Sequence, residues 1–263
     1  MPSVVSNGIR IHYEEQGSGD PLILIMGLGA PASRWTDHAA SYEKRFRCIL
    51  MDNRGAGESD KPGGPYTTKM MADDTAGLMQ VLGIESARIA GISMGSAIAQ
   101  ELALSYPKKI RSLVLISSWS RCDRYTQTVF EHLKKMRELA SPADFVQLLQ
   151  LWIASVPYYE SHFDEMVRDQ TKAEEDYMSL QAFQAQSDAC SMHNTFDRLD
   201  KIIAPTLLTV GDADIFTPLR LTVEMHERMP GSEMIVFKRL GHIHHWEDLE
   251  RFNAVTTQFL SEN

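Results

Sequence analysis

Apolar residues along the chain gather in short runs that are typical of β-strands. Residues 9–13 alternate between apolar and polar side chains, as in a strand with one buried face. Other runs are almost continuously apolar, which indicates strands that are buried on both faces. These runs cover residues 22–26, 48–51, 88–90, 113–116, 206–210 and 234–237.

Segments with helical periodicity alternate with the predicted strands. Residues 67–82 predict a helix with Gly83 as its C-cap, and residues 94–106 predict a helix that ends before a proline. Two more helices are predicted at residues 220–229 and 246–260. The order strand, helix, strand is typical of a parallel sheet covered by helices, so the pattern predicts an α/β fold.

The strand pattern stops in the middle of the chain. Between residues 119 and 197, apolar side chains recur at helical spacing, for example at Val129 and Leu133. Large α/β domains commonly carry such insertions. We therefore expect an α/β core formed by residues 1–118 and 198–263, with residues 119–197 inserted as a helical cap.

Charge and composition exclude several classes of protein. The 263 residues include 26 Lys plus Arg and 35 Asp plus Glu, which gives a formal net charge of −9. Such a chain lacks the positive field that nucleic-acid binding requires. The first residues show no secretory signal, and the apolar run nearest to them is far too short to span a bilayer. We expect a cytoplasmic monomer or homodimer without a nucleic-acid or membrane partner.

Residues 91–95 carry the motif with the most chemical content, the nucleophile elbow G-x-S-x-G between a predicted strand and a predicted helix. The motif requires a tight turn that strains the backbone of Ser93, and Gly91 and Gly95 keep Cβ atoms out of that turn. The N-terminus of the helix offers free N–H groups that stabilise the oxyanion formed when Ser93 attacks a carbonyl. The competing interpretation is a serine that only caps the helix.

Candidate partners for Ser93 follow the late strands. A serine hydroxyl needs a base, and the base needs an acid that orients it. Asp212 and Asp214 follow the predicted strand at residues 206–210, and His242 follows the next strand. The chain order Ser, Asp, His is the one expected when a triad is assembled at the strand ends of such a sheet.

Together these motifs resemble the α/β-hydrolase fold superfamily over residues 8–118 and 198–262. The resemblance implies a mostly parallel eight-stranded sheet flanked by helices, with an inserted helical lid. Within the superfamily the chain looks most similar to the 3-oxoadipate enol-lactonase and small carboxylesterase group. Serine at position 93 distinguishes it from the haloalkane dehalogenase and epoxide hydrolase branches, which have aspartate there.

The resemblance also selects the acid and the base. In the family, the acid lies three residues after the glycine that closes its strand and shortly before a proline, which selects Asp214 over Asp212. The histidine directly follows a glycine, which selects His242 over His244 and His245. The resemblance thus implies a catalytic triad that is assembled from three distant parts of the chain.

Main-chain groups are the expected oxyanion donors. The resemblance implies the N–H groups of Leu28 and Met94. Family members usually have His-Gly where this chain has Met26 and Gly27, a departure that leaves the main-chain donors in place. A nearby segment resembles the family's D-x-R-G-x-G-x-S loop, in which we expect Arg54 to hold neighbouring loops by charge-assisted hydrogen bonds.

A zinc site formed by His242, His244 and His245 is an alternative that the histidine cluster raises. The spacing of these residues does not fit a closed tetrahedral site, and no matched acidic or cysteine ligands accompany them. The three cysteines of the chain match neither a zinc nor a redox spacing. We therefore expect no metal and no organic cofactor.

Three residues are candidates for the wall of a substrate pocket. Arg34 follows the predicted oxyanion loop, Trp119 follows the strand at residues 113–116, and Trp152 lies in the predicted cap. Packing is the competing interpretation for each, because indole and guanidinium groups often line surfaces. If Arg34 faced the pocket, it would favour a substrate with a carboxylate.

These expectations converge on a serine hydrolase that cleaves a small-molecule carboxylic ester or lactone through an acyl-enzyme intermediate. Other chemistries use similar residues on the same fold. The alternatives are a C–C bond hydrolase of the β-diketone type, an aminoacrylate-type hydrolase and a perhydrolase. A small-molecule receptor that retains the triad without turnover is the non-enzymatic alternative.

Overall fold

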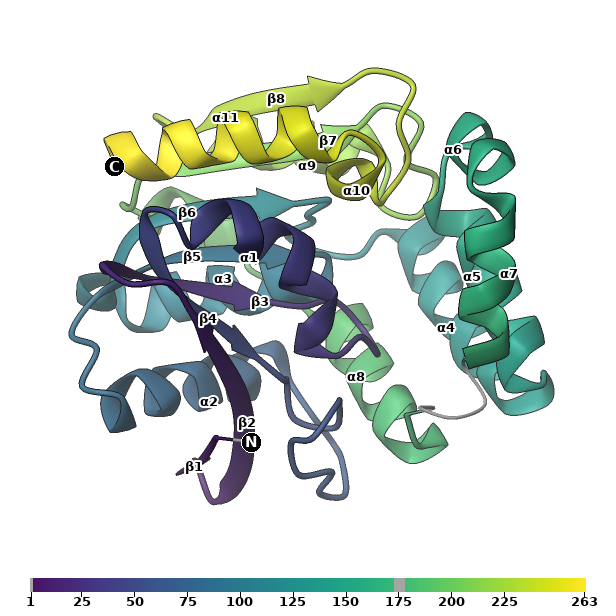
Figure 1. Ribbon diagram of the computed structural model, residues 1–263, viewed down its shortest axis with the longest axis horizontal. Coiled ribbons are helices and arrows are strands. Elements are labelled where there is room, and N and C mark those ends of the chain that lie inside the picture. The colour runs from purple at the N-terminus through teal and green to yellow at the C-terminus, as the bar shows by residue number, and fades with distance from the viewer. Residues whose placement is uncertain (1, 173–177) are drawn as a thin grey trace.

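The computed structural model describes residues 2–172 and 178–263. Within these residues, eight strands form one sheet in the order β1-β2-β4-β3-β5-β6-β7-β8 (Figure 1). The pairs β1–β2 and β2–β4 are antiparallel, and all other pairs are parallel. The strands are β1 (Ser3–Ser6), β2 (Ile9–Gln16), β3 (Asp20–Ile25), β4 (Phe46–Met51), β5 (Ala87–Ile92), β6 (Ile110–Ile116), β7 (Thr206–Gly211) and β8 (Glu233–Phe237).

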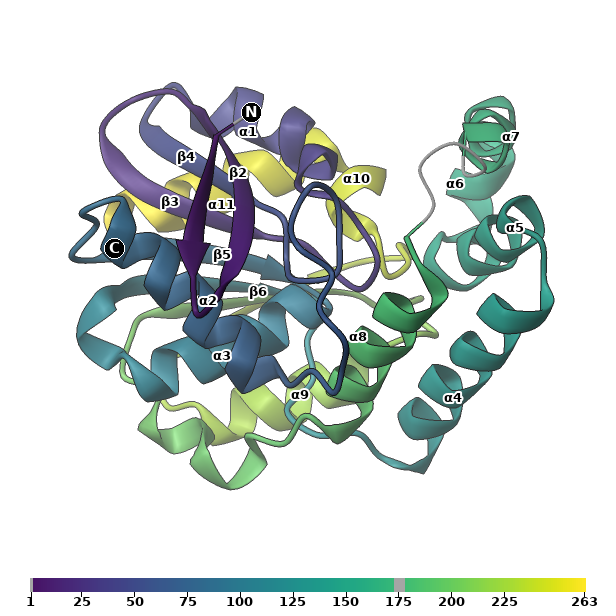
Figure 2. The ribbon, with the colours of Figure 1, turned by 90° about the horizontal axis from the view of Figure 1, so that it is seen from below.

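Helices cover both faces of this sheet. Figures 1 and 2 show α1 and α11 on one face, and α2, α3 and α9 on the other. Alternate residues of β3 serve the two layers, since Ile23 and Ile25 pack with α2 and α3 while Leu22 and Leu24 pack with α1 and α11. The helices of the core are α1 (Thr36–Tyr42), α2 (Thr68–Val81), α3 (Met94–Ser105), α9 (Leu219–Arg228), α10 (His244–Glu247) and α11 (Leu249–Glu262).

The predicted α/β architecture is confirmed, and the apolar pattern missed one strand. Every predicted apolar run coincides with a strand, except that Met26 lies one residue beyond β3, and β1 was not expected from the pattern. It forms a hairpin with β2 through Asn7 and Gly8, which both have positive φ angles of 49° and 78°. Asn-Gly is a strong hairpin signal, because type I′ turns require two residues with positive φ. The signal was present, but β1 is short and mostly exposed.

A run of helices connects β6 to β7. They lie beyond the carboxyl ends of the parallel strands (Figures 1 and 2). The chain leaves and re-enters the core at neighbouring points, where Arg121 forms a β-bridge with Asn194. Residues 173–177 of the expected cap lie outside the described residues. The described helices are α4 (Arg124–Leu139), α5 (Pro142–Ile153), α6 (Val156–Ser161), α7 (Phe163–Lys172) and α8 (Leu180–Met192).

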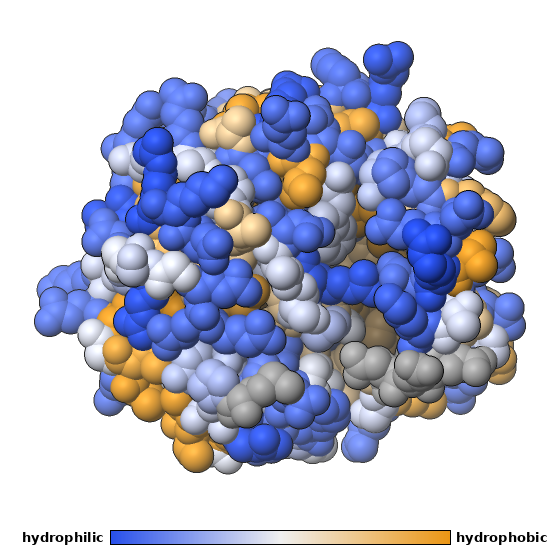
Figure 3. Space-filling model, in the orientation of Figure 1, coloured by the Kyte–Doolittle hydropathy of each residue, from blue (hydrophilic) through white to orange (hydrophobic). Residues whose placement is uncertain are grey.

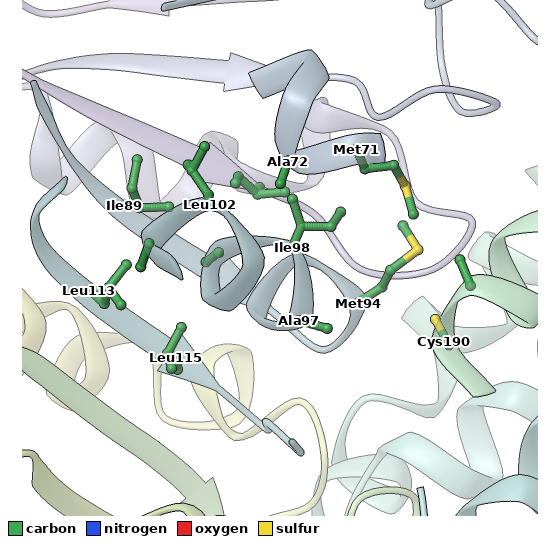
Figure 4. Packing of buried hydrophobic residues seen from close by; sticks show 14 of the residues in the cluster. Met71, Ala72, Ile89, Met94, Ala97, Ile98, Leu102, Leu113, Leu115 and Cys190 are labelled. Atoms are coloured by element: carbon green, nitrogen blue, oxygen red, sulfur yellow. The ribbon is translucent and has the colours of Figure 1, made fainter. Parts of the chain in front are cut away.

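The start of α3 is fixed by packing between layers. Met94, the first residue of α3, is fully buried. Figure 4 shows its side chain pointing toward Met71 on α2. Cys190 on α8 belongs to the same apolar cluster. The side chain of Met94 therefore anchors the helix N-terminus, while its main chain stays at the end of β5.

Arg54 holds its loop to the core by a buried ion pair. Its Nε and Nη2 atoms donate to the two carboxylate oxygens of Asp74 on α2, each at 2.6 Å. Burial raises the pKa of the Asp74 carboxyl, and the Arg54 guanidinium opposes that rise. Both side chains are almost completely buried, at 7% and 1% exposure. The loop-holding role expected for Arg54 agrees with these contacts.

Replacing Arg54 with methionine is expected to lower the free energy of unfolding at pH 7 by about 3–5 kcal/mol, because the Asp74 carboxylate would stay buried without its partner. Removing the guanidinium raises the pKa of Asp74 further, so the loss should shrink as the pH falls and the carboxyl takes up a proton. Urea unfolding at pH 7 and pH 5 measures both effects.

The matched control for that experiment is Arg47→Met. Arg47 also forms a two-bond pair, with Glu15, but both side chains are about one-third exposed, at 32% and 34%. A pair of this kind contributes roughly 0–1 kcal/mol. Equal losses for the two variants would contradict the special role of the buried pair.

Candidate active site

The turn between β5 and α3 places Ser93 in a strained backbone conformation, with φ 52° and ψ −119°. A Cβ atom on Gly91 would lie 2.3 Å from the Gly95 carbonyl oxygen, and one on Gly95 would lie 2.1 Å from the Ile25 carbonyl oxygen. Only glycine fits at either position. Positive φ at a non-glycine residue marks stored strain, which is common at functional sites.

Two main-chain donors lie beside this turn. The N–H groups of Leu28 and Met94 have no hydrogen-bond acceptor among the described residues. The loop after β3 approaches the serine closely, since a Cβ on Gly27 would lie 3.3 Å from Ser93 Cβ. Free N–H groups next to a serine hydroxyl are what an oxyanion hole requires.

Asp214 and His242 meet at the carboxyl ends of β7 and β8. His242 Nδ1 lies 2.8 Å from Asp214 Oδ2. The N–H groups of Phe216 and Thr217 both donate to Asp214 Oδ1 at 2.8 Å, and the Thr217 hydroxyl donates to Oδ2 at 2.9 Å. These bonds hold the carboxylate in one orientation toward the imidazole. The structure therefore brings the expected acid and base together.

The main chain of His242 is anchored one strand away from Ser93. Ile92 and Ile116 are paired in the sheet, so Ser93 and Ser117 follow neighbouring positions. Ser117 Oγ donates to the carbonyl oxygen of His242 at 2.7 Å. Neither Ser93 Oγ nor His242 Nε2 has a hydrogen-bond partner among the described residues, and these residues are 6% and 5% exposed. In substrate-free enzymes the bond between a serine nucleophile and its base is often long and tightens when substrate binds.

The competing residues lie in different environments. Asp212 accepts a hydrogen bond from the Arg239 N–H and forms an ion pair with Lys238, both on the turn after β8. His244 is fully buried, its Nε2 lies 3.0 Å from Thr209 Oγ1, and burial lowers its pKa to about 3. His245 is fully buried among aromatic rings. Within residues 2–172 and 178–263, no group of three His, Cys, Asp or Glu is placed to hold a metal ion.

Several buried histidines predict that the free energy of unfolding decreases as the pH is lowered. Burial lowers the pKa of His38 to about 4, of His193 to about 3 and of His245 well below its usual value. Above about pH 6.5 these imidazoles are neutral in both the folded and the unfolded chain. Below that pH the unfolded chain binds protons that the folded chain does not. The free energy of unfolding therefore decreases as the pH falls from about 6.5 toward the folded pKa values.

Replacing His245 with phenylalanine is expected to flatten this pH dependence by about 2 kcal/mol between pH 7 and pH 5, which is the contribution of one such proton. Both ring nitrogens of His245 lack a hydrogen-bond partner in the described structure. The ring stacks on His38 with centroids 5.3 Å apart, so a phenyl ring suits the site. Urea unfolding across this pH range, with exposed His132→Phe as the control, measures the effect. An unchanged pH profile would contradict the prediction.

The three candidate pocket residues lie in different environments. Arg34 forms an ion pair with Asp169 on α7 at 3.2 Å and is about half exposed. Trp119 is fully buried and packs against Phe130 with ring centroids 5.5 Å apart, so in this structure it contributes to the core and has no accessible surface. Trp152 is partly buried against the same apolar cluster.

Aromatic side chains flank the loops that carry the site. The ring centroids of Phe216 and His242 lie 4.8 Å apart. Phe183 on α8 lies so close to Gly29 that a Cβ atom built on Gly29 would be 3.4 Å from the phenyl ring. Figure 3 shows the surface hollowed between the core and the side of the molecule where α5 and α7 lie in Figure 1, with hydrophobic residues at depth. A hollow of this kind is the usual form of a small-molecule site.

Some supporting contacts had no signal in the sequence. The Thr217 hydroxyl lies 3.0 Å from His242 Nδ1 as well as next to Asp214. Glu247 accepts hydrogen bonds from the N–H groups of Ser155 and Gly241, at 2.8 and 3.2 Å, and so ties the end of α5 to the histidine loop. Gln186 contacts the loop after β3. The contacts of Thr217 with His242, of Ser155 with Glu247 and of Gly29 with Gln186 join positions 25, 92 and 157 residues apart, which residue spacing does not reveal.

No helix in the described part of the chain combines the length and the apolar character needed to cross a membrane.

Known proteins are similar to this chain over almost its whole length. The RutD protein of Azorhizobium caulinodans is 26% identical over 262 residues, which cover 100% of this chain and 96% of RutD. The 2-hydroxy-6-oxononadienedioate/2-hydroxy-6-oxononatrienedioate hydrolase of Comamonas testosteroni is 28% identical, over 97% of this chain and 92% of that protein. The crystal structure of the enol-lactonase from Burkholderia xenovorans LB400 superimposes with a TM-score of 0.91 at 22% identity, covering 99% of this chain and 100% of that one, which is a likeness of fold.

A family model described as alpha/beta hydrolase fold matches residues 20–249. The match includes the strained elbow and the strand ends that carry Asp214 and His242. The resemblance that the motifs indicated is thereby confirmed for the fold. The chain belongs to the α/β-hydrolase fold family.

Proposed function

We propose that this protein is a serine hydrolase that cleaves a carboxylic ester or lactone. The observation that carries the proposal is the 2.8 Å contact between His242 Nδ1 and Asp214, formed at the same sheet edge as the strained elbow of Ser93. An imidazole that donates from Nδ1 to a carboxylate keeps Nε2 free to accept a proton. In this proposal Ser93 is the nucleophile, His242 the base and Asp214 the orienting acid.

The reaction proceeds in two halves. Ser93 Oγ attacks the carbonyl carbon while His242 Nε2 takes its proton, and the Leu28 and Met94 N–H groups stabilise the oxyanion. The bond to the leaving alcohol then breaks, and His242 returns the proton to the alkoxide oxygen. In the second half His242 Nε2 takes a proton from a water molecule, whose oxygen attacks the acyl carbon. The bond between that carbon and Ser93 Oγ then breaks, and His242 returns the proton to Oγ, which releases the acid and the free serine. With a lactone, both products are parts of one hydroxy acid.

The surroundings of the site favour an uncharged acyl group. Phe216 and Phe183 lie close to the loops that carry His242 and Gly29. Arg34, the cation that could have recognised a carboxylate, is neutralised by Asp169. In this proposal residues 119–197 form a cap over the strand ends and supply part of an apolar pocket.

A substrate panel tests the proposal. It contains aryl esters of increasing acyl length, simple lactones, carbamates, a β-diketone and a hydroxy-oxo dicarboxylate related to the substrate that names the Comamonas relative. We expect the highest kcat/KM for an uncharged ester or lactone. Preference for the β-diketone or the dicarboxylate would overturn it in favour of C–C bond hydrolysis.

Two further outcomes of the same panel would also overturn the proposal. Tight binding of a lactone without turnover would indicate a receptor that retains the triad. Formation of a peracid from an ester and hydrogen peroxide, faster than hydrolysis, would indicate a perhydrolase. Each outcome is read from the same protein preparation, so differences in folding do not complicate the comparison.

A further inference from the structure

Gln186, on α8, joins two loops of the core through a single side chain. Its Oε1 atom accepts a hydrogen bond from the Gly29 N–H at 2.9 Å, and its Nε2 atom donates to the Arg54 carbonyl oxygen at 2.8 Å. The side chain is completely buried. One amide group thus connects Gly29 and Arg54, which lie 157 and 132 positions before Gln186 in the chain.

The chemistry of these two bonds requires an amide. Gly29 presents a donor and Arg54 presents an acceptor, so the side chain between them must accept at one end and donate at the other. A carboxylate can only accept, and an apolar side chain can do neither. With an apolar side chain, the part-buried Gly29 N–H and the buried Arg54 carbonyl oxygen would both lose their partner, which is unfavourable.

The loop that carries the proposed oxyanion donor Leu28 is held on both sides. On one side Asn53 Nδ2 donates to the Met26 carbonyl oxygen at 2.9 Å. On the other side Gln186 accepts from the Gly29 N–H. Leu28 lies between these two fixed points, and its own N–H has no acceptor in the described part of the chain. The direction of that N–H therefore depends on both anchors.

We propose that Gln186 is a positioning residue that aims the Leu28 N–H at the oxyanion and couples this donor to helix α8 of the cap. The proposal rests on the serine hydrolase function stated above. Gln186 acts through the loop and does not touch the reacting atoms. Its effect is thus expected in the transition state, where the oxyanion exists, and only weakly in substrate binding.

The first test compares wild type with Gln186→Met, which has a similar length but neither donor nor acceptor. We expect kcat on the best ester of the panel to fall about 10- to 100-fold, approaching the loss of one oxyanion donor, while KM changes little. The affinity for a boronic acid, which forms a tetrahedral oxyanion adduct with serine, should fall by a similar factor. Unchanged kcat and unchanged boronate affinity would overturn the proposal.

Gln186→Glu sharpens the test because it keeps the shape and the acceptor. As a carboxylate it cannot donate to the Arg54 carbonyl oxygen, and it places a negative charge near the developing oxyanion. We expect its kcat and boronate affinity to be at least as low as those of Gln186→Met. Activity equal to wild type in Gln186→Glu would overturn the requirement for an amide.

A matched control separates positioning from loss of stability. Gln150, on α5, is also buried, donates to the Met166 carbonyl oxygen and accepts from Gln170, all within the helical insertion. Gln150→Met should lower the unfolding temperature in the way that Gln186→Met does, yet leave kcat and boronate affinity near wild type. Equal losses of kcat in both variants would reduce Gln186 to a structural residue.

The two proposals fail in different ways. If the serine hydrolase function is wrong, wild type itself either lacks ester and lactone hydrolysis and boronic-acid binding at Ser93, or prefers a C–C or perhydrolysis substrate of the panel. If only the role of Gln186 is wrong, wild type shows both properties and the Gln186 variants share them.

Discussion

Replacing Ser93 with alanine is expected to lower the turnover of any ester or lactone substrate by about 10⁴-fold or more, because Ser93 is the group that forms the acyl-enzyme in the proposed mechanism. Substrate affinity should change little, since the hydroxyl adds little to ground-state binding. The fold should be retained, because Ser93 Oγ has no hydrogen-bond partner among the described residues and alanine adds no atoms to the strained turn. Steady-state kinetics gives the loss in kcat.

Covalent labelling provides an independent measurement of the same residue. A fluorophosphonate probe should label wild type and leave Ser93→Ala unlabelled. Ser112→Ala is a suitable control, because Ser112 is a fully buried serine on β6 whose hydroxyl also has no partner. Labelling of Ser93→Ala at the wild-type rate would remove Ser93 from the role of nucleophile.

Replacing His242 with alanine is expected to lower turnover to the level of Ser93→Ala, because the serine loses its base and the leaving group loses its acid. The two changes should not add in the double variant, since the residues act as one unit. Comparison of kcat for the single and double variants tests this directly. A double variant that is much slower than either single variant would contradict the shared role.

His244→Gln is the matched control for this prediction. His244 lies two residues away and is fully buried, with Nε2 3.0 Å from Thr209 Oγ1. Its pKa of about 3 keeps it neutral, and glutamine can replace its contact with Thr209. We expect stability to change and kcat to remain within about tenfold of wild type. A large loss of kcat in His244→Gln, with His242→Ala still active, would move the base to His244.

Local patterns were sufficient to predict most of the fold. Continuous apolar runs, helical periodicity and the positions of Gly83 and Pro107 identified the parallel strands and most of the helices between them within a few residues, although α1 was not predicted. The elbow at Ser93 was identified from five consecutive residues, because the strained turn can form only with glycine on both sides. The apolar pattern did not predict β1, because a short exposed strand has few apolar positions. The Asn7-Gly8 pair did indicate the hairpin that β1 forms with β2.

Candidate pocket residues were harder to predict than candidate catalytic ones. Trp119 and Arg34 are amphipathic, so their type alone does not say whether they face a pocket, the core or another side chain. The fold decided that Trp119 is buried and that Arg34 pairs with Asp169, 135 positions further along the chain. Neither environment can be identified without knowing how helices α4 and α7 lie on the core.

The amino-acid sequence by itself determined the class of fold, the parallel sheet and the turn that strains Ser93, because hydrophobic periodicity and the five-residue elbow motif are patterns of residues that are close in the chain. The tertiary structure decided which carboxylate holds His242, which histidines are buried and which side chains support the loop at Leu28. Those outcomes depend on contacts such as Gln186 to Gly29, between segments 157 residues apart. Such contacts follow from the packing of whole helices and strands, and no short stretch of sequence specifies them.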